Sequence, residues 1–142
     1  MTTQPGTYVL ILKNRKTSLL RVGRLGTLGL KPGYYVYVGS AFGAGGLAAR
    51  IRHHRQIAIR PHWHIDYLRA ACELVEVWFT TEKSRREHAW AKTVARLPGA
   101  RLPMRRFGSS DCICETHLFR FRYLPTADQF RKCIRTKVNV HR

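Results

Sequence analysis

Acidic residues are scarce in this chain, and its first 65 positions contain none. The 142 residues include 8 Asp or Glu against 26 Lys or Arg, which gives a formal net charge of +18 at pH 7. Ten Lys or Arg precede the first acidic residue, Asp66. Such a balance says nothing about the fold, but it favours a polyanionic partner, and we expect that partner to be nucleic acid.

Long apolar runs and a disulfide pattern are also missing. The first apolar run, residues 8–12, is too short for the core of a signal peptide or for a membrane span. The four cysteines, at positions 72, 112, 114 and 133, have no regular spacing. We therefore expect a cytoplasmic protein with reduced thiols and no membrane partner.

The composition is that of a globular protein, because 44% of the residues are hydrophobic and 11% are aromatic. A length of 142 residues predicts a single domain over 1–142. Hydrophobic patterns and turn residues predict an α+β order. We expect strands at 8–13, 18–22, 34–39, 73–80 and 117–123, and helices at 47–57, 64–71, from 81–84 to about 97, and after Pro125. We interpret the segment with Gly23, Gly26 and Gly29 as a loop.

Five side chains in the first two-thirds of the chain are sufficient for metal-assisted phosphoryl transfer. Arg50 and His54 are four residues apart, so they share one face of a helix. A guanidinium clamps a phosphate with paired donors, and a histidine orients groups or passes protons near neutral pH. Glu87 supplies the single carboxylate that a magnesium site with several waters needs. Tyr8 and Tyr37 complete the set.

The two tyrosines need their surroundings in order to act. A free phenol has a pKa near 10 and is a poor base at neutral pH. A nearby cation such as Arg50 lowers that pKa. Tyr35 has the strand parity of Tyr37, and we expect it to support packing instead.

The order of these residues resembles the GIY-YIG nuclease superfamily over about residues 6–97. The first motif reads Gly6-Thr7-Tyr8, and the second reads Tyr37-Val38-Gly39. Two further stretches, 62–68 (HWHIDYL) and 107–112 (FGSSDC), resemble a small branch of that superfamily. The resemblance implies a small three-stranded antiparallel sheet flanked by helices. To this core, about 6–97, we add an inserted ribbon between the motif strands and a C-terminal strand and helix extension over about 98–142.

The resemblance also implies an activity. It identifies Arg50 as the catalytic arginine, His54 as the helix histidine and Glu87 as the ligand of Mg²⁺ or Mn²⁺, with the Tyr8 and Tyr37 hydroxyls in the site. Glu82 is the alternative register for the glutamate, although it precedes the helix proper.

We expect a metal-dependent endonuclease acting on DNA, with Arg52 and Arg55 contacting the nucleic-acid backbone. A non-catalytic nucleic-acid-binding module and an RNA-directed nuclease are the alternatives. The sequence contains no zinc-finger or helix-turn-helix pattern. Specificity is therefore expected from DNA structure, from single-strandedness or from a partner protein.

Two other groups carry side chains of the metal-binding type. His62, His64 and Asp66 alternate with apolar residues, a pattern that more often anchors a helix start. Cys112, Cys114 and His117 offer three soft ligands, whereas a structural zinc site needs four. Cys72 and Cys133 are distant candidates for the fourth. The alternative is that Ser109, Ser110 and Asp111 cap a buried turn, against which the cysteines pack as small apolar groups.

Overall fold

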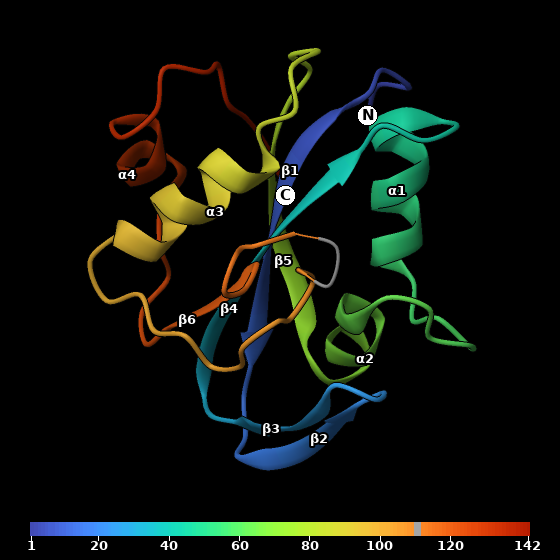
Figure 1. Cartoon of the computed structure of the whole chain (residues 1–142), viewed down its shortest axis with the longest axis vertical. Helices are drawn as coiled ribbons and strands as arrows, with labels where there is room; N and C mark the ends of the chain where they lie inside the picture. Colours follow the sequence, from blue (N-terminus) through green and yellow to red (C-terminus); the bar gives the residue numbers. More distant parts are fainter. Residues whose placement is uncertain (110–111) are drawn as a thin grey trace.

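A computed structural model describes residues 1–109 and 112–142 and shows one twisted sheet between two layers of helices (Figure 1). The elements are, in chain order, β1 (Gly6–Asn14), β2 (Ser18–Val22), β3 (Gly26–Leu30), β4 (Gly33–Ala41), α1 (Gly46–Arg55), α2 (His64–Ala71), β5 (Glu73–Thr80), α3 (Glu87–Arg96), β6 (Leu118–Phe121), α4 (Ala127–Arg131) and β7 (Asn139–His141). The predicted α+β class is confirmed.

The main sheet is larger than the sequence predicts. Its five strands lie in the order β6-β4-β1-β5-β7, and all pairs are antiparallel. The expected three strands are the central β4, β1 and β5. The predicted C-terminal extension adds β6 at one edge and β7 at the other. A strand as short as β7 carries too little periodic pattern to be predicted.

The predicted ribbon between the motif strands is present, but the loop predicted within it is confined to residues 23–25, and the prediction is wrong from Gly26 onward. Residues 26–30 form β3, which pairs with β2 in an antiparallel two-stranded sheet. Leu28 and Leu30 are buried at the spacing of a strand, while a Cβ added at Gly29 would meet no atom within 4 Å. Gly29 therefore lies on the open face of a strand, whereas Gly23 does lie in the turn between β2 and β3.

Alternate residues of β1 feed two separate cores, one on each face of the sheet. Tyr8, Leu10 and Leu12 pack with buried residues of α1 and α2, and Val9 and Ile11 pack with those of α3 and α4. Figure 1 shows these helix pairs on opposite sides of the sheet. Because both faces are covered, the strand is apolar at every position from 8 to 12 instead of alternating.

Two helix boundaries differ from the prediction. Helix α3 begins at Glu87 rather than at 81–84, because Thr7 Oγ1 on β1 accepts a hydrogen bond from the Arg86 backbone N–H at 3.2 Å. Helix α1 ends at Arg55, where the Arg69 guanidinium donates to the carbonyls of His54 and Arg55 at 2.7 and 3.0 Å. Both differences result from contacts between segments that are distant in the sequence, so local sequence signals do not predict them.

The cysteines lie within the described residues, and each is a free thiol. Over residues 1–109 and 112–142, no helix is both long enough and apolar enough to cross a bilayer.

Candidate active site

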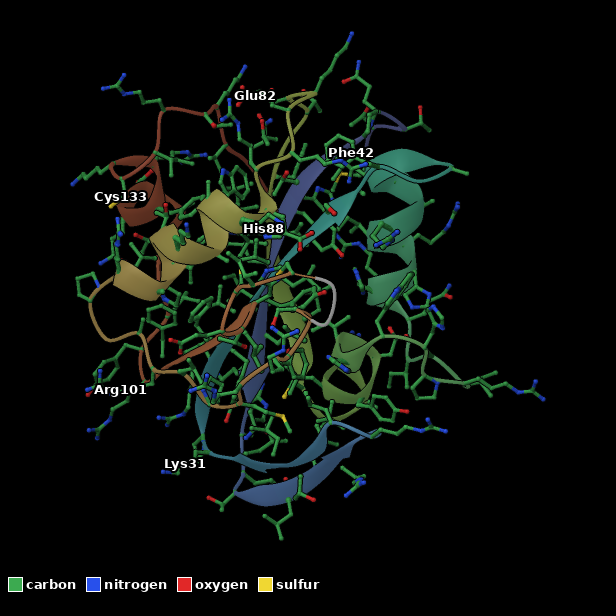
Figure 2. All side chains as sticks on the ribbon, viewed as in Figure 1. Lys31, Phe42, Glu82, His88, Arg101 and Cys133 are labelled. Carbon is green, nitrogen blue, oxygen red and sulfur yellow. The ribbon has the colours of Figure 1, made fainter. Side chains whose placement is uncertain are left out.

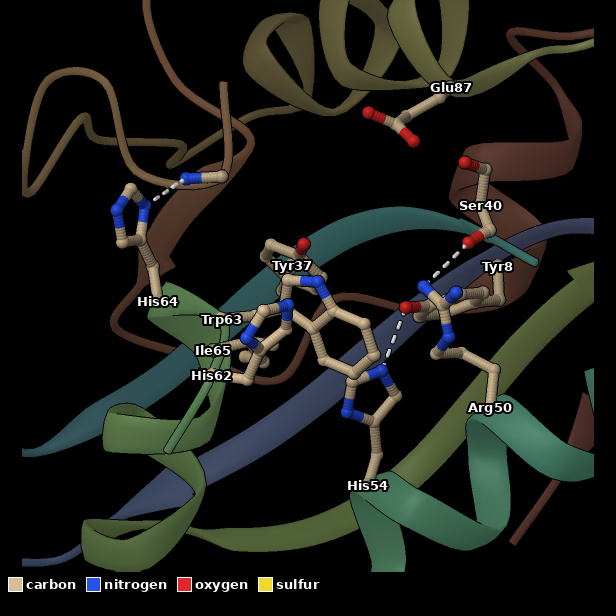
Figure 3. Close-up of a pocket in the computed structure, with 11 residues that line it drawn as sticks. Tyr8, Tyr37, Ser40, Arg50, His54, His62, Trp63, His64, Ile65 and Glu87 are labelled. Carbon is tan, nitrogen blue, oxygen red and sulfur yellow. Dashed lines mark hydrogen bonds between the residues drawn. The ribbon is translucent and has the colours of Figure 1, made fainter. Parts of the chain in front are cut away.

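All five predicted catalytic side chains line one cleft of about 380 Å³. They come from β1, β4, α1 and α3, and Figure 3 shows them converging on a common space. Among the residues that the structure describes, Glu87 is the one acidic residue that lines this cleft. The full lining consists of Tyr8, Tyr37, Ser40, Arg50, His54, His62, Trp63, His64, Ile65, Glu87 and Gly108.

The Tyr8 hydroxyl lies 2.7 Å from His54 Nε2, and this pair joins the first motif to helix α1. Burial lowers the pKa of His54 to about 3, so the ring is neutral and its Nε2 is free to accept the phenol proton. Gly39 stands opposite Tyr8 in the neighbouring strand, and a Cβ there would lie 2.5 Å from the Tyr8 oxygen. The glycine that ends the second motif is therefore needed to make room for the tyrosine of the first.

The pKa of Tyr8 is raised, mainly because the phenol is fully buried. Arg50 acts in the direction that the sequence predicts and lowers this pKa, but its effect is smaller than that of burial. In the protein alone Tyr8 is consequently a neutral phenol that donates a hydrogen bond, rather than a preformed base.

Arg50 is held by a hydrogen bond to a backbone carbonyl and by an aromatic ring. Its Nη1 donates to the Ser40 carbonyl oxygen at 3.0 Å, and its Cζ lies 4.4 Å from the centre of the Trp63 ring. Stacking on an aromatic face leaves the edges of a guanidinium available for a planar partner. The cleft therefore presents an oriented cation to a ligand.

Tyr37 is 9% exposed and places its hydroxyl in the cleft (Figure 3). Its ring packs edge-on against Phe107, and a Cβ at Gly108 would come within 2.7 Å of it. Tyr35 behaves as predicted, because it is fully buried and its hydroxyl accepts a hydrogen bond from the Lys31 backbone at 3.0 Å. Tyr35 and Tyr37 lie on the same face of β4, so strand parity does not distinguish them. Their positions along the strand do, because Tyr37 lines the cleft and Tyr35 does not.

Glu87 is the first residue of α3, where the helix dipole favours a negative charge. Burial opposes its ionisation, yet polar contacts with His117 and Ser40 outweigh burial and hold the pKa of this carboxyl below its usual value. The closest contact joins Glu87 Oε2 to His117 Nδ1 at 2.9 Å. With 20% of its side chain exposed, Glu87 is an ionised carboxylate that remains accessible from the cleft.

The first group of metal-type side chains is a helix anchor. Asp66 accepts hydrogen bonds from the backbone N–H groups of His62 and Trp63 at 2.9 and 3.0 Å, and from His53 Nε2 at 2.8 Å. His64 faces elsewhere, where its Nδ1 accepts from the Gly108 N–H at 2.8 Å. The helix-start interpretation is thus confirmed, and His62 and His64 contribute to the cleft wall instead of sharing a ligand set with Asp66.

Two groups of described residues have the geometry to hold a metal ion. They are His53 with His54 and Asp66, and His88 with Cys112, Cys114 and His117. The second group contains the three soft ligands predicted from the sequence, with His88 in place of Cys72 or Cys133. Ser110 and Asp111, which we expected in a capping turn, lie outside the described residues.

Arg52 and Arg55, the predicted backbone-contacting residues, are exposed on α1. Sequence reasoning did not assign Thr7, Ser40 and Trp63 to the site, and it named His117 only as a zinc-ligand candidate, not as the partner of Glu87. Thr7 had a signal, because it is a polar residue of opposite parity to Tyr8 inside an apolar strand. Ser40, Trp63 and His117 act through contacts between distant segments, for which a single sequence gives no signal.

A family model described as "Domain of unknown function DUF123" matches residues 7–139. That span covers most of the chain, so the chain belongs to this family. No curated protein matches the chain, and no solved structure matches it either. The family description states no activity, and the resemblance to GIY-YIG nucleases stays a prediction.

Proposed function

We propose that this member of the DUF123 family is a divalent-metal-dependent endonuclease that hydrolyses phosphodiester bonds in DNA. The observation that carries the proposal is the convergence of Tyr8, Tyr37, Arg50, His54 and Glu87 on a single cleft. The first and last of these residues are 79 positions apart and the five come from four elements, so proximity along the chain does not explain their meeting.

Glu87 is the residue that would hold Mg²⁺ or Mn²⁺. Its carboxylate is ionised, partly exposed and directed into the cleft, and hard divalent cations prefer such oxygen ligands. One protein carboxylate, the substrate phosphate and several waters complete a typical magnesium shell. The bound ion supplies Lewis-acid stabilisation of charge on the phosphoryl and leaving oxygens.

Arg50 binds the scissile phosphate. Trp63 and the Ser40 carbonyl already hold the guanidinium, so little side-chain entropy is lost when a phosphate arrives. Its paired N–H donors match two phosphoryl oxygens and remain charged at every working pH.

Tyr8 and His54 orient the attacking water. When Tyr8 donates its proton to His54 Nε2, its oxygen keeps two lone pairs, of which one accepts from Arg50 and the other can accept a hydrogen bond from water. As water attacks phosphorus, this hydrogen bond keeps it in line, and the neutral His54 ring, whose low pKa makes it a poor base, fixes the direction of the Tyr8 phenol. The Tyr37 hydroxyl, in the same cleft, steadies the water or a phosphoryl oxygen.

Nucleic acid is the substrate class that suits the charge and the open site. The net charge of +18 attracts a polyanion, and α1 presents exposed Arg52 and Arg55 beside Arg50 and His54. With no separate base-reading module in the sequence, we expect selectivity for DNA structure or for single strands.

The test is a cleavage survey over single-stranded, duplex, flapped, nicked and mismatched DNA, with RNA of the same sequence, in Mg²⁺, Mn²⁺ or EDTA. We expect metal-dependent cleavage of DNA that Glu87→Gln abolishes. Glu73→Gln is the matched control, because Glu73 forms an exposed ion pair with Arg15 outside the cleft. DNA binding without cleavage in any metal would favour a non-catalytic module, and cleavage confined to RNA would favour the RNA-directed alternative.

A further inference from the structure

A four-residue cluster lies behind Glu87, outside the cleft lining. It consists of His88 at the start of α3 and Cys112, Cys114 and His117 in the segment before β6. One ligand atom from each residue lies within 4.8 Å of all the others. Figure 2 shows His88 in the middle of the molecule, near the end of α3 from which Glu87 also projects.

The separations within the cluster fit a tetrahedral ion. Cys114 Sγ lies 3.3 Å from His88 Nδ1, and Cys112 Sγ lies 3.5 Å from His117 Nε2. Zinc bonds of about 2.3 Å to sulfur and about 2.0 Å to nitrogen, at tetrahedral angles, place neighbouring donors roughly 3.3–3.8 Å apart. Two thiolates also neutralise a divalent cation, which a chain with a charge of +18 otherwise repels.

The chain around the cluster has little regular secondary structure. Residues 97–117 connect α3 to β6, and their described part forms no helix and only one isolated bridge, between Arg101 and Arg120. Connections of this length without secondary structure are uncommon in compact domains. Nevertheless, Phe107 and His117 in this segment are completely buried. A metal ion would tie such a segment to α3.

We propose that His88, Cys112, Cys114 and His117 bind one structural Zn²⁺ that fastens the 97–117 segment to the start of α3. Four protein ligands close the coordination shell, so the ion has no open position for substrate. Sulfur and imidazole ligands in tetrahedral geometry select zinc over the hard cations that suit Glu87.

His117 connects this site to the cleft. Its Nε2 faces the cluster, and its Nδ1 lies 2.9 Å from Glu87 Oε2. When Nε2 binds zinc, the proton must lie on Nδ1, the ring atom that is 2.9 Å from the carboxylate, and acidic partners of this kind commonly orient histidine ligands. The zinc ion thereby orients Glu87. This second step rests on the proposed nuclease function, whereas the zinc site itself does not.

Zinc binding is measured on the protein alone, without nucleic acid. After expression and refolding in Zn²⁺, we expect about one equivalent of zinc per chain to survive gel filtration. Replacement by Co²⁺ should give thiolate-to-cobalt charge-transfer bands and the strong visible bands of a tetrahedral ion. A wild-type protein that retains no zinc and gives no such spectrum overturns the proposal, and this measurement needs no variant.

Variants then assign the ligands. Cys114→Ser and His88→Ala should each weaken zinc binding on the order of 10²-fold or more, because a lost ligand costs more than the 10- to 100-fold typical of a lost outer partner. Cys133→Ser is the matched control, since Cys133 is exposed at the outer edge of the molecule, beyond α4 (Figure 2). Unchanged zinc affinity in both ligand variants would overturn the assignment.

The Glu87→Gln variant distinguishes the zinc-site proposal from the proposed nuclease function. We expect this variant to keep its zinc, with affinity weakened about 10- to 100-fold, and to lose cleavage. A zinc-loaded wild type that cleaves nothing would refute the nuclease proposal but leave the zinc site standing. Magnesium-dependent cleavage by a protein that binds no zinc would do the reverse.

Discussion

The Arg50 guanidinium lies over the indole of Trp63, with its Cζ 4.4 Å from the ring centre, while its Nη1 donates to the Ser40 carbonyl. These two contacts come from different elements and fix the cation before any phosphate arrives. An arginine that is oriented in advance loses little freedom on binding, which is how a positioned charge accelerates a reaction.

Arg50→Lys should reduce the single-turnover cleavage rate by on the order of 10²-fold, because lysine keeps the charge but loses the planar pair of donors. Trp63→Leu should have a smaller effect, roughly 10-fold, since the Ser40 contact remains. Rapid-quench kinetics at saturating enzyme measures both. Arg52→Lys is the matched control on the same helix, and equal rates for Arg50→Lys and Arg52→Lys would contradict the assignment.

Tyr37→Phe should slow cleavage and leave thermal stability nearly unchanged, because the variant keeps the ring that packs on Phe107. Tyr35→Phe should do the opposite. It removes the hydrogen bond to the Lys31 backbone, which costs about 1 kcal/mol in the free energy of unfolding, without touching the cleft. Urea denaturation and single-turnover rates, measured on both variants, test this crossed pattern. If the rates of the two variants coincide, the Tyr37 hydroxyl has no catalytic role.

Protonation of His54 should destabilise the fold as the pH falls. The ordinary pKa of 6.5 in the unfolded chain exceeds the folded value of about 3, so the unfolded state binds the proton first. The stabilising contribution is complete above pH 6.5 and is lost on going down toward pH 3, at up to about 1.4 kcal/mol for each pH unit.

Comparison of wild type with His54→Asn isolates this effect from the acidic residues, which titrate in both proteins. Urea denaturation between pH 7 and pH 4 should give a steeper loss for the wild type. Parallel pH profiles would show that His54 is not held neutral by the fold.

DNA affinity should depend strongly on salt. Neutralising about six phosphates makes log K fall linearly with log salt, with a loss on the order of 10³-fold between roughly 50 and 200 mM. Arg52→Ala and Arg55→Ala should each reduce the slope by about one contact and hardly change the rate of bound substrate. Titration in Ca²⁺, used to suppress cleavage, measures the slope. An affinity indifferent to salt would show that the basic surface is not where DNA binds.

The sequence predicted the fold best where a pattern is local and long. The bounds predicted for β2, α2 and β5 are those of the structure, because each segment combines a clear period with a turn or cap residue at its ends. The predictions failed at β3, at the start of α3 and at β7. At the first two, a distant partner decides the conformation: the core beneath Leu28 and Leu30 in one case, and the Thr7 hydroxyl in the other.

The candidate site shows the same contrast between what local sequence patterns predict and what contacts between distant segments decide. The five predicted catalytic residues meet in one cleft because the motif order encodes them. The contacts that hold these five side chains in place do not follow from the order of the motifs. Three contacts, of Trp63 with Arg50 and of Ser40 and His117 with Glu87, depend on how segments 13 to 47 positions apart are brought together. The fourth member of the metal cluster, His88, was missed for that reason.

The last third of the chain supplies both edge strands of the sheet and one wall of the cleft. The parts of the site are therefore synthesised in a fixed order. Translation delivers the basic segment with Tyr8, Tyr37 and Arg50 first and Glu87 later, and Gly108 and His117 follow after that. A nascent chain can therefore attract nucleic acid well before it can present the complete set of catalytic contacts. Under the proposed nuclease function, attraction of nucleic acid would precede cleavage during synthesis, until residue 117 has left the ribosome.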